Sequence, residues 1–259
     1  FPHHPYGTQT VLGTQEDLKN PSITNIKEYY KKWYVPNNMA ICLSGDFDPD
    51  QMIATIDKYF GGLKPNPDLP KLDLPKETPI TAPVVREILG PDAESVALAW
   101  RFPGAADKDV ETLQVVSQIL YNGQAGLIDL DLTQQQKTLS AYCYPMTMSD
   151  YSAFMMQGRP KQGQTLDEVK DLLLGELKKL REGDFDEKML EANINNFKLY
   201  QMQQLENNDA RADMFVESFV NGSDWADEVT ALDRMSKLTK DDIVAFANKY
   251  LKDDNYAVI

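Results

Sequence analysis

Residues 22–41 decide the fold: S-I-T-N-I-K-E-Y-Y-K-K-W-Y-V-P-N-N-M-A-I recurs in weaker form at residues 239–258 as T-K-D-D-I-V-A-F-A-N-K-Y-L-K-D-D-N-Y-A-V. Both copies follow one pattern, in which a capping hydroxyl precedes an amphipathic helix, a polar turn and an apolar strand. A repeat with so long a period indicates duplicated domains rather than a solenoid. The identical pairs at this constant offset are Ile26/Ile243, Lys32/Lys249, Asn38/Asn255 and Ala40/Ala257.

The surroundings of the two copies predict the domain organisation. After the first copy the sequence continues from Cys42 as C-L-S-G-D-F-D-P-D-Q-M-I-A-T-I-D-K-Y-F-G-G-L, whereas the second copy is followed only by Ile259. We therefore expect a fragment of a duplicated architecture. Residues 1–63 would be the C-terminal tail of a first α/β domain, residues 64–83 a proline-rich linker, and residues 84–259 a second α/β domain lacking its closing strand and helix.

Local patterns predict the elements in order. Six prolines between residues 64 and 83 remove amide donors and favour an extended linker. Because the strands come together and most helices come late, the order predicts an α+β fold, a repeated α/β domain whose mixed, largely antiparallel sheet is packed by helices on one face. The predicted helices are 22–33, 49–60, 107–121, 166–182, 186–206, 209–220, 225–235 and 239–250, and the predicted strands are 39–45, 84–89, 94–102, 139–147 and 151–158.

Hydrophobic periodicity predicts the core of the second domain. Alternation across residues 94–102 puts four large side chains on one face of a strand, and two helical stripes face the same interior. Four methionines are expected to fill gaps in this core. The predicted core residues are Val96, Leu98, Trp100 and Phe102; Val110, Leu113, Val116, Ile119 and Leu120; Leu166, Val169, Leu173, Leu177 and Leu180; and Met146, Met148, Met155 and Met156.

Composition limits the class of partner. The 259 residues are 42% hydrophobic and 25% charged, as in ordinary globular proteins, and carry a net charge of −14. This acidity argues against nucleic acid or an anionic membrane as the main partner and is compatible with a basic or neutral polypeptide. No apolar run approaches the roughly 18 to 20 residues that a membrane-inserted helix needs. Cys42 and Cys143, both in apolar segments, are expected to be buried thiols rather than a disulfide or a metal pair.

The search for catalytic and metal-binding motifs assigns no site residue. His3 and His4 are the only histidines, and a catalytic zinc usually needs three protein ligands. We expect both histidines to be exposed or packed in a turn. The sequence contains no H-x-x-E-H, no G-x-S-x-G and no P-loop, and it offers no base for a serine or cysteine nucleophile apart from these two histidines.

Aspartates and glycines imitate two other sites without completing them. Asp46, Asp48 and Asp50 resemble the opening of a calcium loop, but Gln51 and Asp57 stand where such a loop needs glycine and glutamate. Asp48 is therefore predicted to cap the helix that begins at Pro49. Residues 123–126, G-Q-A-G, are expected to be a hinge or tight connection after a helix. We interpret four further carboxylates as turn and cap residues, not as acid–base pairs: Asp129, Asp131, Asp184 and Asp186.

Three segments carry a resemblance to a known family. H-P-Y-G at residues 4–7, N-P-S-I-T-N-I-K-E-Y-Y-K-K-W-Y-V-P-N-N-M-A-I at 20–41 and S-G-D-F-D-P-D-Q-M at 44–52 resemble the insulinase/pitrilysin family of zinc metallopeptidases. Weaker matches follow at Y-N-G in 121–123 and at S-A-Y-C-Y in 140–144.

The resemblance implies repeated α/β domains that form two bowl-like halves around an unfolded peptide. A complete relative would carry zinc on H-x-x-E-H with a distal glutamate, and in the family these residues precede the H-P-Y-G segment. No metal ligand or catalytic residue is therefore transferred to this chain. An arginine–tyrosine pair of the family has no recognisable counterpart, around Arg159 or elsewhere.

Three interpretations follow. The favoured one is a non-catalytic segment of a zinc metallopeptidase that degrades or processes peptides, forming part of the chamber wall and supporting substrate. Its partners would be the remainder of the parent chain or a complementary half, together with a peptide. Zinc is expected in the complete parent, with no cofactor and no activity in this chain alone. The alternatives are a non-catalytic partner subunit or peptide-binding relative, and a stand-alone module. A chain that ends within a strand argues against the last, because it exposes a sheet edge.

Overall fold

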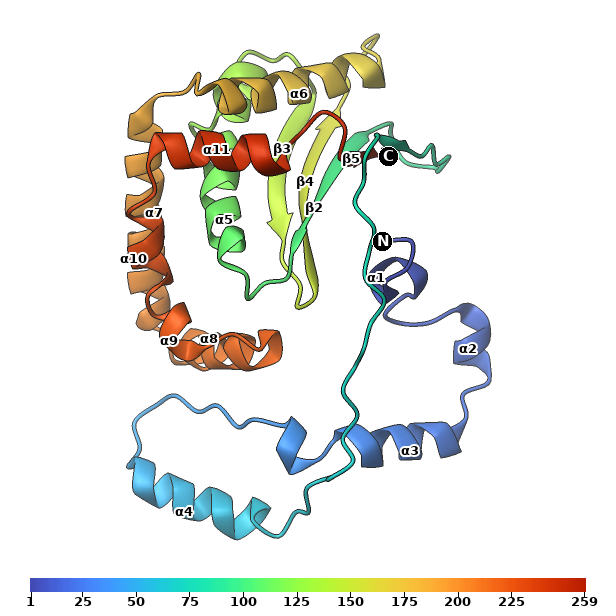
Figure 1. Ribbon diagram of the computed structural model, residues 1–259, viewed down its shortest axis with the longest axis vertical. Helices are drawn as coiled ribbons and strands as arrows, with labels where there is room; N and C mark the ends of the chain where they lie inside the picture. The colour runs from blue at the N-terminus through green and yellow to red at the C-terminus, as the bar shows by residue number, and fades with distance from the viewer. The chain divides into compact units, whose positions relative to one another are not determined.

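The computed structural model describes residues 1–259 and divides them into two compact units, Phe1–Pro79 and Ile80–Ile259 (Figure 1). The boundary falls inside the proline-rich run, and no helix or strand lies between Phe60 and Val84. None of the helices combines the length and apolar character needed to cross a membrane.

The first unit is helical. α3 (Ile23–Trp33) and α4 (Pro49–Phe60) confirm the two predicted helices, and their caps are those expected. The Ser22 side chain accepts a hydrogen bond from the Asn25 amide, and Asp48 accepts one from the Gln51 amide at 2.9 Å. Local capping also produces two short helices that periodicity did not predict, α1 (Pro5–Thr8) and α2 (Gln15–Lys19), and a 3₁₀ turn, η1 (Pro36–Asn38).

The strand predicted at residues 39–45 is wrong for this structure, since the segment carries no ladder hydrogen bonds. Its counterpart in the repeat does form a strand, β5 (Tyr256–Val258), because β5 lies between two partners that satisfy its backbone groups. The same local sequence pattern thus occurs in both copies, and only the copy with neighbouring strands becomes part of a sheet.

A five-stranded sheet organises the second unit, in the order β1-β5-β2-β4-β3. β1 pairs with β5 in parallel, and the other pairs are antiparallel. This mixed, largely antiparallel sheet with its helices confirms the predicted α+β class. The predicted strand 84–89 is much shorter than expected. The strands are β1 (Val84–Val85), β2 (Val96–Pro103), β3 (Ser140–Met146), β4 (Tyr151–Arg159) and β5.

Helices cover the face of the sheet that carries Trp100 and Phe102. Phe102 stacks on Phe246 of α11, and a Cβ on Gly158 of β4 would lie 2.4 Å from Val169 of α6. These helices are α5 (Lys108–Leu120), α6 (Leu166–Glu182) and α11 (Lys240–Tyr250). The others are α7 (Glu187–Leu205), α8 (Asn208–Asn221), α9 (Trp225–Glu228) and α10 (Ala231–Met235).

Two helical predictions need correction. The helix expected at 225–235 is divided into α9 and α10, because the Thr230 hydroxyl donates to the Ala226 carbonyl and ends the first piece. The sequence pattern also did not predict η2 (Asp129–Thr133), a π-helical turn that follows the glycine-containing connection.

The predicted core is largely confirmed. Its strand and helix residues are buried, except that Leu166 is only partly buried. Among the methionines only Met156 is fully buried; Met146 at the end of β3 is 43% exposed, and Met148 and Met155 are half-buried. Cys143 is a buried free thiol, as expected, whereas Cys42 is also free but only partly buried.

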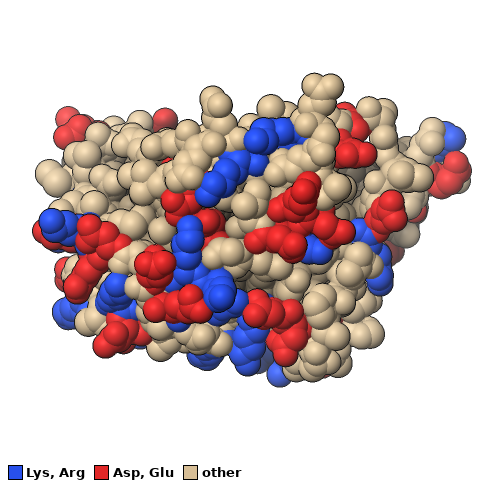
Figure 2. Space-filling model, turned by 90° about the horizontal axis from the view of Figure 1, so that it is seen from above, with Lys and Arg blue, Asp and Glu red and all other residues tan.

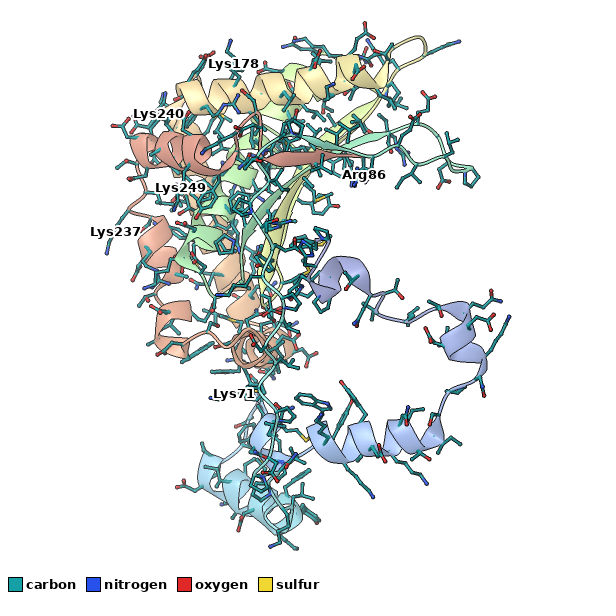
Figure 3. The ribbon with its side chains drawn as sticks, turned by 45° about the vertical axis from the view of Figure 1, so that its right-hand side comes forward. Lys71, Arg86, Lys178, Lys237, Lys240 and Lys249 are labelled. Carbon is teal, nitrogen blue, oxygen red and sulfur yellow. The ribbon has the colours of Figure 1, made fainter.

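Polar contacts fix α11 at both ends (Figure 3). Lys240 Nζ donates to the Phe185 carbonyl at 2.7 Å, and Lys249 Nζ lies 2.9 Å from Asp109 Oδ2 at the start of α5. The Tyr250 hydroxyl donates to the same Asp109 oxygen. These bonds hold the repeated helix in register over the sheet.

Candidate functional site

The histidines do not form part of a metal site. No group of three or more His, Cys, Asp or Glu side chains is placed to hold a metal ion. His3 is exposed, whereas His4 is buried and its Nδ1 accepts a hydrogen bond from the Tyr6 amide at the start of α1. The backbone amides of both histidines donate to Glu77 Oε1. The imidazole of His4 therefore caps α1.

The glycine-containing connection, residues 123–126, follows α5 as predicted and also precedes a helical turn, η2. The donors that such a turn offers are already used, since buried Asp129 accepts hydrogen bonds from the Asn122 amide at 3.0 Å and the Gly126 amide at 2.9 Å. A carboxylate of the chain thus takes the position that an anionic ligand would occupy. The connection is structural.

The other candidate carboxylates have structural partners or lie in solvent. Asp131 pairs with Lys179 Nζ at 2.7 Å, which also contacts buried Glu176 at 3.0 Å, and the network ties η2 to α6. Burial raises the pKa of the Glu176 carboxyl, and Lys179 offsets part of that rise. Asp186 caps α7 through the Lys188 amide, and Asp184 is exposed.

The sequence repeat is reproduced in backbone detail. Thr239 caps α11 as Ser22 caps α3, in each case through the amide three residues on. Both helices end alike: the Asn38 side chain donates to the Trp33 carbonyl at 3.0 Å, and Asn255 donates to the Tyr250 carbonyl at 2.8 Å. The two helices are therefore equivalent elements, residue by residue.

Their apolar faces differ in exposure. Ile243, Phe246 and Ala247 of α11 are buried, with 0, 6 and 0% of their surface exposed. The equivalent side chains of α3 are 57, 61 and 59% exposed: Ile26, Tyr29 and Tyr30. In this chain α3 thus presents to solvent the face that its repeat buries against a sheet and two helices.

The sheet face opposite the helices carries a half-buried aromatic strip. The Tyr142 hydroxyl of β3 donates to Gln157 Oε1 of β4, and Gln157 Nε2 donates to the Tyr144 hydroxyl at 3.3 Å. The two tyrosine rings stack with centroids 6.1 Å apart. The motifs did not predict this strip, although the alternation of tyrosines with Ala141 and Cys143 is a signal for it. The strip is suited to apolar and hydrogen-bonded contact with a polypeptide.

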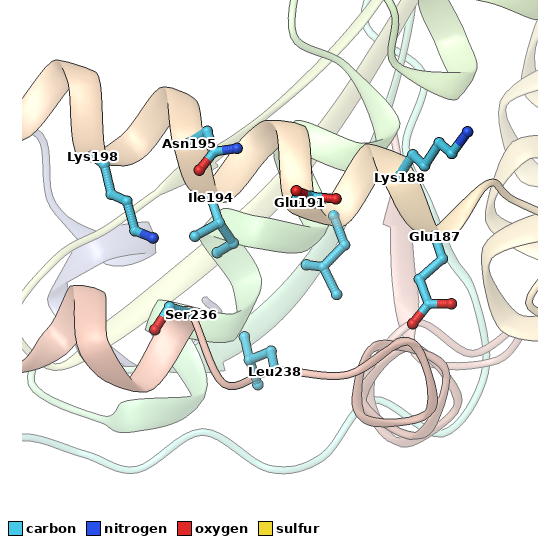
Figure 4. Close-up of a pocket in the computed structure, with 9 residues that line it drawn as sticks. Glu187, Lys188, Glu191, Ile194, Asn195, Lys198, Ser236 and Leu238 are labelled. Carbon is cyan, nitrogen blue, oxygen red and sulfur yellow. The ribbon is translucent and has the colours of Figure 1, made fainter.

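A shallow groove of about 490 Å³ follows α7 (Figure 4). Leu190 and Ile194 of α7 and Leu238 of the connection before α11 supply its apolar side chains. Lys198 and Glu191 stand at its rim, so no single charge dominates. On the face that carries α6, acidic and basic side chains are likewise intermixed (Figure 2). Lys170 pairs with Asp167 there, and Lys178 with Glu182.

Comparison with protein families identifies the family of this chain. The family described as the peptidase M16 inactive domain matches residues 22–197. The chain belongs to the peptidase M16 family. This confirms the resemblance to the insulinase/pitrilysin peptidases.

This chain spans about 60% of the length of several relatives. A Helicobacter pylori protein named zinc protease PqqE is 25% identical over 259 residues, which cover 98% of this chain and 57% of the relative. The crystal structure of a protease from Helicobacter pylori aligns with a TM-score of 0.86 at 22% identity, covering 95% of this chain and 60% of that one. The peptidase M16 inactive domain from Pseudomonas fluorescens aligns with a TM-score of 0.80 at 17% identity, covering 95% and 59%. At these identities the structures support the shared fold.

Proposed function

We propose that the chain is the non-catalytic part of a zinc-dependent M16 peptidase and that it supports peptide substrates within a chamber completed by a zinc-bearing part. The match to an inactive domain and the name of the Helicobacter pylori relative, zinc protease PqqE, support this assignment.

The exposed face of α3 is the observation that carries the proposal. α11 shows what this element packs against, namely β2 through Phe102 and the helix α6. Three large apolar side chains that are about 60% exposed leave a considerable hydrophobic gain unrealised, at about 25 cal/mol per Å² of apolar surface. A complementary α/β body, from the parent chain or from another subunit, would bury them as α11 is buried.

The aromatic strip of β3 and β4 is the proposed peptide-supporting surface of this part. Tyrosine supplies apolar area with a polar tip at low entropic cost, and Gln157 joins the two hydroxyls into one row. A surface of this kind can bind a peptide without selecting a particular sequence, which suits a surface that supports varied substrates.

Reconstitution tests the proposal. The purified chain alone is expected to bind no stoichiometric zinc and to leave a fluorogenic peptide uncleaved. Addition of the part of the parent that carries H-x-x-E-H should produce zinc-dependent cleavage. Ile26→Asp should weaken this reconstitution, because the substituted position lies on the exposed apolar face of α3.

Lys31→Asp is the matched control, because its equivalent on α11, Asn248, is exposed. Equal reconstitution by the two variants would contradict the role of the α3 face. Metal-dependent cleavage by the chain alone would contradict the assignment as a non-catalytic part.

The alternative is a non-catalytic subunit whose zinc-bearing partner is a separate protein. A Schizosaccharomyces pombe relative, 29% identical over 73 residues, is named a probable mitochondrial-processing peptidase subunit beta, so subunit organisation occurs among the relatives. The coding sequence of the parent separates the two forms, because an H-x-x-E-H motif upstream in the same reading frame favours a single chain.

A further inference from the structure

The outward side of α8 exposes an apolar stripe. Val216, Phe219 and Val220 are 42, 52 and 64% exposed, and their spacing of three and four residues places them side by side on the helix. The inward side of α8 is already packed, since Ser218 is buried and donates to the Ser223 carbonyl at 3.1 Å. Nothing within the second unit therefore requires this stripe.

A row of carboxylates borders the stripe. Asp209, Asp213 and Glu217 follow one another at intervals of four residues and are all exposed. Asp213 lies three residues before Val216, and Glu217 three before Val220, so each carboxylate neighbours an apolar side chain of the stripe.

The same carboxylates line a groove of about 490 Å³ between α7 and α8. Tyr200 and Gln204 of α7 form its other wall. Tyr200 is 61% exposed, so the apolar surface continues across the groove from α8 to α7.

Charge is strongly one-sided in this region. Residues 199–230 contain seven Asp and Glu but only one basic residue, Arg211, which donates a hydrogen bond to the Asn208 side chain. The α6 face, by contrast, mixes both signs (Figure 2). The most acidic stretch of the second unit thus coincides with exposed large apolar side chains.

We propose that the stripe, the carboxylate row and the groove form a docking surface for a cationic amphipathic peptide segment. Apolar side chains of the segment would lie on Val216, Phe219 and Val220, and its Lys or Arg side chains would face Asp213 and Glu217. The charge selects this partner over others. A second copy would bring two acidic surfaces together, and nucleic acid and anionic membranes are repelled by the same carboxylates.

The docking surface shares no residue with the exposed face of α3 or with the aromatic strip of β3 and β4, on which the proposed function rests. Binding can therefore be measured on the full chain without a zinc-bearing part. Failure of this experiment would leave the reconstitution experiment unaffected.

Fluorescence anisotropy with two synthetic peptides tests the proposal. One is a labelled Leu/Lys helix of about 18 residues, and the other has Glu at every Lys position. The Leu/Lys peptide should bind at least about tenfold more tightly, and its affinity should fall with added salt because the contact is partly electrostatic.

Variants locate the surface. Asp213→Asn with Glu217→Gln should weaken binding about three- to tenfold, because each exposed ion pair contributes up to about 1 kcal/mol. Val216→Ser with Phe219→Ser should weaken binding while leaving the salt dependence in place. The matched control, Asp171→Asn with Glu182→Gln on α6, removes the same charge and should leave the affinity unchanged.

Three results would overturn the proposal. Equal affinity for the two peptides would show apolar attraction without charge selection. Equal weakening by the α6 control would show a general effect of net charge. Self-association of the chain that Val216→Ser with Phe219→Ser abolishes, without peptide binding, would assign the surface to a second copy.

Discussion

The two copies of the repeated helix allow one substitution to be compared in two environments. Ile243 of α11 is completely buried, whereas Ile26, its equivalent on α3, is 57% exposed. Replacement of a buried isoleucine by alanine removes its transfer free energy and leaves a cavity, which together cost about 2 to 5 kcal/mol. At an exposed helical site the same change is close to neutral, because alanine has the higher helix propensity, by about half a kcal/mol.

Ile243→Ala should therefore lower the free energy of unfolding of the second unit by about 3 kcal/mol. For a unit of this size 1 kcal/mol corresponds to roughly 2 to 4 °C, so the melting temperature should fall by about 6 to 12 °C. Ile26→Ala should leave the same transition within about 1 °C. Differential scanning calorimetry of the two variants and the unsubstituted chain measures both values, and circular dichroism checks that helix content is retained.

If Ile26→Ala lowered the melting temperature as much as Ile243→Ala, the explanation of the two effects by burial would be refuted. A shift below about 2 °C for Ile243→Ala would refute the assignment of α11 to the core. A small effect of Ile26→Ala in the isolated chain, followed by a large effect after reconstitution, is the pattern that the proposed function requires.

Three further predictions test other features. Gly158→Ala should destabilise the second unit by about 1 to 3 kcal/mol, because the new Cβ would lie 2.4 Å from Val169. Gly175→Ala within α6 should stabilise the second unit by up to about 1 kcal/mol, because a Cβ there would meet no neighbouring atom within 4 Å. Chemical denaturation measures both changes. Burial opposes ionisation of Asp109, but hydrogen bonds from Tyr250 and Lys249 outweigh it and lower the pKa of Asp109. The ionised carboxylate of Asp109 therefore stabilises the fold fully above the ordinary Asp pKa of about 3.9, and this stabilisation is lost as the pH falls through the lowered folded-state pKa. Asp109→Asn should accordingly lower the melting temperature at neutral pH, by an amount that shrinks as the pH falls. A difference in melting temperature that stays constant with pH would contradict this. Elemental analysis should find well below one zinc per chain, and about one zinc, removable with loss of cleavage, would contradict the absence of a site here.

The sequence predicts those parts of the fold whose causes are local or periodic. Asp48 and Thr239 are N-cap residues whose type predicts where α4 and α11 begin. The alternation through Leu98 and Trp100 predicts the buried face of β2. The split between α9 and α10 depends on one hydroxyl, Thr230, competing for a carbonyl, and η2 depends on buried Asp129. Such side-chain contacts leave no periodic signal.

The candidate surfaces are harder to predict because they depend on what remains uncovered. Tyr29 has the helical position of Phe246 in the repeat, and only the structure shows that its side chain is 61% exposed while that of Phe246 is buried. Likewise Val216 and Phe219 have the spacing of a buried stripe, yet they lie on the outward side of α8. Periodicity identifies an apolar face but does not say whether this chain or another one covers it.

The repeat supplies the missing criterion, since it gives an internal reference for burial. When two segments share their caps, their C-terminal asparagine bond and their apolar spacing, a difference in exposure between them cannot come from local sequence. It must come from the elements packed around each copy. α11 has such elements and α3 lacks them in this chain, so the exposed face of α3 measures what a complementary body would have to supply. α8 has no internal counterpart, so its docking surface depends instead on the charge beside the apolar stripe.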